Sequence, residues 1–356
     1  MPQADGTKEK KMKAAILGIS GYTGMILLRM LADHPEIKEI IPVSSSKPGE
    51  KILDIDPGIG KAVMEKTAAI DNCVVDISSA ITKKPDVVFA ALPHLASATM
   101  CEPFFGKSIV IDLSADLRIK DHDLFTKAYG VPPPSPEILK QAVYGLCEIY
   151  EKEIKKADII ANPGCYPTCT LLPIIPLAAK GLIQGTIVTN ALSGISGAGK
   201  KATIGNLYVE RTENTCAYLP GKTHRHFTEI KKEIDSFDKS LEIFFNPHLV
   251  PLKRGMHAAS VVALKGNVSD QDIEKVYREY YGNKKFIVLK GKKLPETRDV
   301  WGSNRCDIAW QIQDGKILLF SVIDNLIKGA SGQAVQNMNL RFNFDEAAGL
   351  KLYGEL

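Results

Sequence analysis

The chain has 356 residues, 45% of them hydrophobic and 24% charged, which is long enough for two domains of ordinary size. These proportions exclude general disorder and collagen-like or coiled-coil composition. The net charge is only +4, and the basic excess gathers in Lys8, Lys10, Lys11 and Lys13. We therefore expect residues 1–12 to form a short, solvated, disordered leader and not a nucleic-acid surface.

The sequence shows neither a targeting segment nor a disulfide pattern. The leader has no apolar core of a signal peptide, and no stretch approaches the roughly 18 uninterrupted apolar residues that a membrane-spanning helix needs. The seven cysteines form no Cys-x-x-Cys pair, and an odd number in a chain this long argues against a disulfide framework. We therefore expect a cytoplasmic protein with no membrane or nucleic-acid partner.

The first part of the chain alternates apolar strands with helices. An apolar strand over Ala14–Leu17 leads into a glycine-rich turn at residues 18–24 and then into a helix over Met25–Asp33. Further strands are predicted at Glu39–Val43, Asp86–Leu92, Ser108–Leu113 and Asp158–Ala161. Most are continuous apolar runs, which are typical of parallel strands buried on both faces. This order predicts a doubly wound α/β domain of Rossmann type.

After Gly164 the pattern changes. Strands are predicted at Thr186–Leu192, Leu241–Phe245, Met256–Leu264, Phe286–Leu289, Arg305–Gln313 and Lys316–Ile323, and amphipathic helices at Phe227–Phe237 and Gln271–Tyr281. The last two strands are joined at Asp314-Gly315, which signals an antiparallel hairpin. The predicted fold class is therefore a Rossmann-type parallel-sheet domain plus an α+β domain with a mostly antiparallel sheet.

A final helix over Gly329–Leu340 follows the last strand and can return to the first domain. We therefore assign residues 13–164 with 325–356 to the Rossmann domain. Residues 165–324 are assigned to the second, α+β domain.

The glycine turn is a candidate cofactor site. A strand that leads into a helix N-terminus presents unpaired N–H groups to an anion, and glycines let the backbone approach a pyrophosphate. The candidate residues are Gly18, Ser20, Gly21, Tyr22, Thr23 and Gly24. Their spacing is G-x-x-G-x-x-G instead of the usual G-x-G-x-x-G, so a merely structural turn is the alternative.

The second strand ends without the Asp or Glu that normally holds the ribose hydroxyl of NAD. Ser44, Ser45, Ser46 and Lys47 follow it instead. Hydroxyl donors and a cation suit a ribose 2′-phosphate, so we expect the cofactor to be NADP(H), with Ser44 and Ser46 as contacts. A plain polar loop is the alternative.

Cys165 is the candidate nucleophile. A short strand and the turn Asn162-Pro163-Gly164 precede it, and an apolar helix follows, so the thiol is expected at a helix N-terminus. An ordinary cysteine has a pKa near 8.5, and the positive end of a helix lowers that value. The same N–H groups can hold a developing oxyanion. We therefore interpret Cys165 as reactive and Cys169, one turn deeper, as a core residue.

The segment around His224 and His226 offers a proton carrier, since histidine titrates nearest to neutral pH. If His226 opens a helix, Glu229 lies over the same face and can orient the ring. A structural histidine is the alternative. His-x-His is also a metal signature, but no third ligand stands at an obvious spacing, so we expect no metal.

Residues 194–200 match the first seven positions of a phosphate-binding loop, but Lys201 stands where Ser or Thr would hold magnesium. We therefore interpret this segment as a glycine loop beside the cofactor. Its candidate contacts are Ser196 and Gly197.

Several segments together resemble the N-acetyl-γ-glutamyl-phosphate reductase family. They are residues 18–24, Asn-Pro-Gly-Cys-Tyr-Pro-Thr at 162–168, Ser-Gly-Ile-Ser-Gly-Ala-Gly-Lys at 193–200 and His-Arg-His at 224–226. Residues 113–118, 248–256 and 324–334 are similar as well, so the resemblance covers nearly all of the chain after Met12. Thr228 stands where the family often has proline, and Cys147 where Gly-Leu-Pro-Glu is usual. These departures bear on loop geometry and not on chemistry.

The resemblance implies an enzyme of arginine biosynthesis, related to aspartate-semialdehyde dehydrogenase. It further implies that residues 13–164 with 325–356 form the NADP-binding Rossmann domain and that residues 165–324 form the catalytic and oligomerisation domain. Such an enzyme reduces N-acetyl-γ-glutamyl phosphate with NADPH through a cysteine thioester and releases phosphate. The resemblance assigns Cys165 as nucleophile and His226 as acid/base, and it implies that Arg118 and Arg254 meet anionic groups of the substrate. It also places Pro93, His94, Ser193, Gly194 and Asn325 near the cofactor.

Other functions stay open at this point. A related reductase would act on aspartyl or aminoadipyl phosphate, and a metal-dependent hydrolase would use His224 and His226. A binding-only protein with a degenerate Rossmann fold is a further alternative. The sheet of the second domain offers an interface, so we expect a homo-oligomer, either a dimer or a tetramer.

Overall fold

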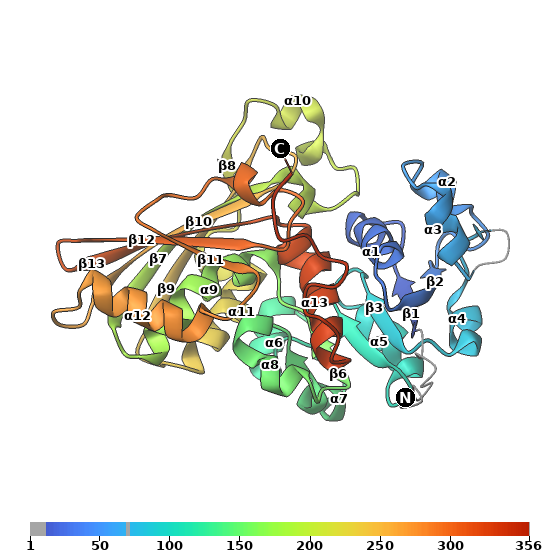
Figure 1. Cartoon of the computed structure of the whole chain (residues 1–356), viewed down its shortest axis with the longest axis horizontal. Coiled ribbons are helices and arrows are strands. Elements are labelled where there is room, and N and C mark those ends of the chain that lie inside the picture. Colours follow the sequence, from blue (N-terminus) through green and yellow to red (C-terminus); the bar gives the residue numbers. More distant parts are fainter. Residues whose placement is uncertain (1–11, 69–71, 356) are drawn as a thin grey trace, which may run out of the picture.

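The computed structural model describes residues 12–68 and 72–355 and contains two separate β-sheets (Figure 1). The leader predicted at residues 1–12 lies outside these residues except for Met12, which begins the first strand and is buried. Within the described ranges, no helix has both the length and the apolar character needed to cross a membrane.

The first sheet has six parallel strands in the order β2-β1-β3-β4-β6-β5. The strands are β1 (Met12–Leu17), β2 (Ile37–Val43), β3 (Val87–Ala90), β4 (Ile109–Asp112), β5 (Val143–Tyr144) and β6 (Ile159–Ala161). The prediction of a parallel Rossmann-type sheet is therefore confirmed. The sequence missed β5, because two residues carry no periodicity.

Both faces of this sheet are buried, as continuous apolar strands require. Along β1, Ala14 and Ile16 pack into one hydrophobic cluster, whereas Ala15 and Leu17 pack into another. The first cluster includes residues of α1 (Tyr22–Ala32) and α13 (Gly332–Arg341), and the second includes residues of α4 (Ile77–Lys83) and α5 (Ser97–Cys101). The remaining α-helices of this part are α2 (Ile52–Ile55), α3 (Lys61–Lys66), α6 (His122–Tyr129), α7 (Pro136–Gln141) and α8 (Cys147–Ile154).

The second sheet has seven strands in the order β11-β12-β13-β10-β7-β9-β8. They are β7 (Ile183–Gly194), β8 (Cys216–Ala217), β9 (Glu242–Val250), β10 (Met256–Leu264), β11 (Ile287–Gly291), β12 (Cys306–Gln313) and β13 (Lys316–Ile323). The pairs β7–β9 and β11–β12 are parallel and the others are antiparallel. The hairpin predicted at Asp314-Gly315 is present, and both of its residues have positive φ.

One face of the second sheet is covered by α9 (Cys165–Ala179), α11 (Arg225–Asp235) and α12 (Asp270–Tyr281), all of which contribute to a single hydrophobic cluster. The helix α9 is apolar on every side and is buried almost throughout. Two prolines inside it, Pro173 and Pro176, cannot donate to the preceding turn. The carbonyl groups left free accept hydrogen bonds from side chains of other elements instead: Cys169 O from the Ser321 hydroxyl and Leu172 O from the Tyr281 hydroxyl.

The chain returns to the first domain after β13, as predicted for residues 329–340. The helix predicted there begins as a π-helical turn, η7 (Ile327–Ser331), and continues as α13. Val335 and Met338 of α13 are fully buried in the cluster under the first sheet. Figure 1 shows α13 between the two sheets. The domain boundaries at 164 and 325 stay a prediction.

Candidate active site

Cys165 is the first residue of α9, directly after the turn that ends β6, as the sequence predicts. The residue is partly exposed. Cys169, one turn deeper, is fully buried, and its sulfur lies 3.4 Å from the Ser321 carbonyl oxygen. Accessibility therefore distinguishes the two cysteines in the way the sequence analysis expects.

The thiol of Cys165 is less acidic than its place in the helix suggests. Burial by the surrounding protein raises its pKa to about 11, although the N–H of Tyr166 and the cations Arg118 and Arg225 act to lower it. The expected lowering by the helix N-terminus is therefore outweighed by desolvation. The sulfur is protonated at neutral pH in the protein without ligands, so its attack requires a base.

Alkylation of Cys165 by iodoacetamide tests this conclusion. Without ligands, the rate is expected to rise roughly tenfold per pH unit and to keep rising through pH 9, because the thiolate fraction grows until the pH passes the pKa of about 11. Mass spectrometry of the labelled peptide measures this rate. A rate that levels off between pH 7 and pH 8 would contradict the raised pKa.

His226 lies on α11 beside the turn that carries Cys165. A Cβ added at Gly164 would be 2.6 Å from Nε2 of His226, so the ring rests against the Gly164 backbone. Nε2 is therefore within about 8 Å of the Cα of Cys165. Burial lowers the pKa of His226 well below 6.5, and the neighbouring His224 and Arg225 act in the same direction, so its imidazole is neutral. A neutral imidazole can accept a proton from the thiol.

Gly164→Ala is expected to lower kcat/KM by about 10²-fold, because the methyl group must displace the imidazole of His226 from the turn. Steady-state assays would measure the loss. Gly60→Ala is the matched control, since an added Cβ at Gly60 meets no atom within 4 Å. If both substitutions lower kcat/KM equally, the loss does not come from displacement of the His226 imidazole.

Glu229 does not orient His226, contrary to the interpretation from the sequence. One carboxylate oxygen accepts from the Tyr144 hydroxyl at 2.7 Å and from the Gly164 N–H at 3.0 Å, and the other accepts from Arg118 at 3.0 Å. Nδ1 of His226 is buried and has no hydrogen-bond partner among the described residues. Glu229 therefore fixes the turn that precedes Cys165.

Arg118 also differs from its expected role. Its guanidinium donates to the carbonyl oxygens of Asn162 and Leu113 and to Glu229, and the residue is only 4% exposed. These contacts hold the turn before Cys165 and leave little surface for a ligand. A direct contact between Arg118 and the substrate stays a prediction that this geometry does not favour.

Arg225 lies close to the nucleophile. It stands between the two histidines in the sequence and was not predicted as a site residue. Its positive charge lowers the pKa of both Cys165 and His94. Among the residues described, no carboxylate forms an ion pair with Arg225. The cation is therefore available to an anionic ligand. Only the three-dimensional neighbourhood identifies it, since an Arg between two histidines has no distinctive spacing.

His224 has a structural role that explains its place before His226. Its Nδ1 accepts the backbone N–H of His226 and so caps the N-terminus of α11, while Nε2 lies 3.4 Å from the Tyr218 hydroxyl. Within residues 12–68 and 72–355, no group of three or more His, Cys, Asp or Glu side chains is placed to hold a metal ion.

The glycine turn has the backbone geometry that a dinucleotide needs. Gly18 has φ +85°, and an added Cβ there would lie 2.3 Å from the Ala91 carbonyl oxygen. An added Cβ at Gly24 would lie 2.4 Å from the Gly18 carbonyl oxygen, so neither position accepts a side chain. The helix α1 begins at Tyr22, and the N–H groups of its first turn are available to an anion. Ser20 and Thr23 lie in the same turn.

The polar segment after β2 makes contacts within itself. Ser44 is buried and its hydroxyl accepts the N–H of Ser46, which is exposed. Lys47 forms an ion pair with Glu50 at 2.7 Å, so its charge is partly compensated. Exposed ion pairs contribute about 0–1 kcal/mol, so a phosphate can compete for the lysine.

Pro93 and His94 belong to a loop after β3 that Asp116 organises. The carboxylate of Asp116 accepts the N–H groups of Leu95, Ser97 and Ala98. Nδ1 of His94 accepts the Ala115 N–H at 3.0 Å, and burial lowers the pKa of His94 to about 3. The imidazole of His94 is therefore neutral, and the hydrogen bond holds it near the positive charges of Arg225 and Arg118.

The glycine loop after β7 lies against Asn325. The amide of Asn325 donates to the Ser196 hydroxyl at 3.0 Å, and its oxygen accepts the Gly255 N–H at 2.7 Å. An added Cβ at Gly197 would lie 3.0 Å from the Ser193 hydroxyl. An added Cβ at Gly194 would lie 2.8 Å from the Arg254 backbone. A 3-10 turn, η3 (Ile195–Ala198), follows β7, so this segment lacks the long helix of a phosphate-binding loop.

Arg254 lines a pocket of about 540 Å³ between α1 and the glycine loop. It forms an ion pair with Asp324, and its Nε is buried without a hydrogen-bond partner in the described chain. The other cations that line the pocket are Arg29, Lys200, Lys201 and Lys253. The position of Arg254 therefore suits an anion.

Comparison with known proteins identifies the family. Residues 13–157 match the family described as semialdehyde dehydrogenase, NAD binding domain, and residues 165–325 match semialdehyde dehydrogenase, dimerisation domain. The chain is 41% identical over 97% of its length to the whole of N-acetyl-γ-glutamyl-phosphate reductase from Campylobacter jejuni subsp. doylei. The chain belongs to the N-acetyl-γ-glutamyl-phosphate reductase family. It is also 42% identical over 96% of its length to 98% of the enzyme of that name from Lachnoclostridium phytofermentans.

Solved structures agree on the fold of the family. Aspartate semialdehyde dehydrogenase II from Vibrio cholerae has a TM-score of 0.70 at 16% identity, over 94% of this chain and 98% of that one. The enzyme from Candida albicans, solved with NADP, has a TM-score of 0.67 at 17% identity, over 92% and 98% of the two chains. Membership of the family makes the chain an oxidoreductase with a nicotinamide-binding domain, which decides against the hydrolase alternative.

Proposed function

We propose that the protein reduces N-acetyl-γ-glutamyl phosphate with NADPH to N-acetyl-L-glutamate 5-semialdehyde and releases phosphate, as a step of arginine biosynthesis. The observation that carries the proposal is the partly exposed Cys165 at the start of α9, beside the neutral imidazole of His226. The names of relatives at about 41% identity support the substrate.

The chemistry begins with proton transfer. As Sγ of Cys165 attacks the acyl carbon, His226 takes the thiol proton, and the N–H groups at the start of α9 stabilise the oxyanion. Phosphate leaves and a thioester remains on Cys165. A nicotinamide cofactor, when bound at the glycine turn, would supply the hydride that reduces the thioester carbon. The resulting thiohemiacetal expels the Cys165 sulfur as a thiolate, which His226 protonates, and the semialdehyde is released.

Arg225 and Arg254 are the cations that we assign to the anionic groups of the substrate. Arg225 has no ion-pair partner among the described residues, and its positive charge acts to lower the pKa of Cys165. Arg254 lines the pocket beside Ser196, and its pairing with Asp324 holds it there. Two separate cations suit a substrate that carries a phosphate at one end and a carboxylate at the other.

We propose NADP(H) as the cofactor in preference to NAD(H). The glycine turn suits the pyrophosphate, and the hydroxyl groups of Ser44 and Ser46 lie 3.4 Å apart at the end of β2. No carboxylate stands at that strand end to hold a free ribose hydroxyl. Pro93, His94, Ser193, Ser196, Gly197 and Asn325 are the further contacts that we assign to the cofactor.

The test is reduction of NADP by the purified protein with N-acetylglutamate semialdehyde, with and without phosphate. Phosphate-dependent formation of NADPH is expected, and the rate with NAD should be lower. Aspartate semialdehyde and the carrier-linked aminoadipate semialdehyde are assayed side by side. Preference for either of these would replace the proposed substrate, and no reduction with any of the three would reject the activity.

We also propose that the protein is a cytoplasmic homo-oligomer. The face of the second sheet opposite α9 carries Phe244, which is 61% exposed, and this segment matches a dimerisation domain. A second copy that covers this face would bury it. Light scattering of the purified protein measures the mass, and a monomer at micromolar concentration would contradict the proposal.

A further inference from the structure

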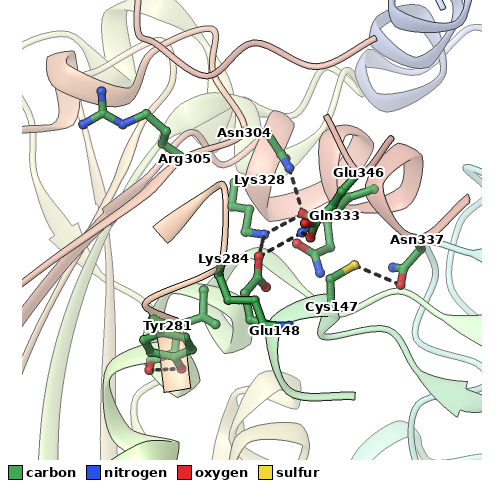
Figure 2. Close-up of polar contacts among 12 residues, drawn as sticks. Cys147, Glu148, Tyr281, Lys284, Asn304, Arg305, Lys328, Gln333, Asn337 and Glu346 are labelled. Carbon is green, nitrogen blue, oxygen red and sulfur yellow. Dashed lines mark hydrogen bonds and ion pairs between the residues drawn. The ribbon is translucent and has the colours of Figure 1, made fainter. Parts of the chain in front are cut away.

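A fully buried ion pair joins η7 to α8, and both elements lie in the part of the chain assigned to the first domain. Nζ of Lys328 lies 2.6 Å from Oε1 of Glu148, and both side chains are completely shielded from solvent. Gln336 completes the network, because its amide oxygen accepts from Lys328 at 2.8 Å and its nitrogen donates to Glu148 at 2.9 Å. Asn304, which precedes β12, also donates to Gln336. Figure 2 shows the side chains of Glu148, Lys328 and Asn304 converging from α8, η7 and the segment before β12.

A buried ion pair of this kind contributes little to the stability of a fold. Desolvation of two charges can exceed their mutual attraction, and well-packed apolar replacements are often neutral or stabilising. Here Oε2 of Glu148 has no hydrogen-bond partner in the described chain, so the pair is not fully compensated. Lys328 nonetheless holds the pKa of Glu148 below its usual value, against the effect of burial. Glu148 is therefore ionised at neutral pH. The pair offers more for the position of the two elements that it joins, η7 and α8, than for the stability of the fold.

Lys328 lies in the π-helical turn η7, and this turn touches both halves of the site. An added Cβ at Gly329 would lie 2.6 Å from the Cβ of Cys165, so η7 rests directly against the nucleophile. The Ser331 hydroxyl donates to the Thr23 carbonyl oxygen, in the helix that follows the glycine turn, at 3.0 Å. Isolated π-helical turns are rare and concentrate at functional sites. One short segment therefore separates the sulfur from the cofactor turn.

We propose that the Lys328–Glu148 pair is a positioning device. It fixes η7 against α8 and thereby sets the distance between the sulfur of Cys165 and the glycine turn. That distance determines how close the thioester would come to the nicotinamide of a cofactor whose pyrophosphate the turn would hold. This inference rests on the proposed function. Acylation of Cys165 does not need that distance, whereas hydride transfer to the thioester does. A misplacement of about 1 Å costs as much as 10²-fold in rate.

The test compares the two half-reactions in the double variant Lys328→Met/Glu148→Leu, which removes both charges and leaves neither one unpaired. Phosphate released in the first turnover without NADPH reports acylation, and intact-protein mass spectrometry reports the thioester on Cys165. The expected result is phosphate release within about twofold of the unmodified protein. Reduction of the accumulated thioester by NADPH is expected to be about 10- to 100-fold slower.

Lys284→Met is the matched control, because Lys284 forms its ion pair with Glu151 on the same helix α8, and no ion pair or hydrogen bond of the described chain joins it to η7. It should leave both half-reactions within about twofold. The inference fails if the double variant leaves reduction unchanged, or if acylation and reduction fall together with the melting temperature, as loss of stability alone would cause. If the unmodified protein forms no thioester, the proposed function fails, and the phosphate burst separates that outcome from failure of the inference.

Discussion

Cys165→Ser is expected to reduce turnover by more than about 10⁴-fold while NADP binding stays within about twofold. Serine is a weaker nucleophile, and the oxygen ester that it would form is reduced far less readily than a thioester. Burial raises the pKa of the thiol itself to about 11, so a hydroxyl in the same place is still harder to ionise. Turnover is measured by NADPH oxidation and binding by fluorescence titration.

The matched control for this variant is Cys169→Ala. Cys169 is buried one turn deeper and contacts Ser321, away from any surface that a substrate can reach. The control should retain most of the activity and lose some thermal stability, because it leaves a small cavity. Turnover retained by Cys165→Ser would reject the nucleophile.

His226→Asn is expected to lower kcat by about 10²- to 10⁴-fold, because no base remains to take the thiol proton. The pH dependence gives a sharper readout. In the unmodified protein the pKa of His226 lies well below 6.5, so the imidazole is already the neutral base at pH 7, and activity falls only as the pH drops towards that pKa. In the variant only preformed thiolate attacks, so kcat should keep rising with pH towards the pKa of Cys165.

His224→Asn is the control for His226→Asn. Asparagine is a favoured N-cap residue and can still accept the backbone N–H that His224 accepts, so α11 should stay in place. We expect a much smaller loss of kcat and an unchanged pH profile. If both variants lose activity equally, the histidines act as structural elements and His226 is not the base.

The course of the chain was predictable wherever the pattern was long. The strands Met256–Leu264 and Lys316–Ile323 have the same bounds as the predicted strands. Uninterrupted apolar or alternating runs of that length are typical of β-strands. The two-residue strands β5 and β8 were missed because they depend on pairing with neighbours. The π-helical turn before α13 was also missed, because periodicity does not distinguish it from an α-helix.

The site was predictable only in its local parts. The start of a helix at Cys165 follows from the turn and the apolar run around it. The partner of Glu229 does not, because Arg118 lies 111 residues away in the sequence and only the fold brings it to the carboxylate. A spacing of three residues placed Glu229 on the same helix as His226, but Arg118, Tyr144 and Gly164 occupy its oxygens. Desolvation of Cys165 is likewise a property of the packed state.

The most direct measurement is the mass of the intact protein after it is mixed with N-acetylglutamate semialdehyde and NADP in the absence of phosphate. The account predicts a burst of about one NADPH per active site, with one N-acetylglutamyl group bound through sulfur at Cys165. Phosphate added afterwards should remove that group and restart turnover. A burst with no covalent adduct, or an adduct that forms equally on Cys165→Ser, would contradict the thioester on which the account depends.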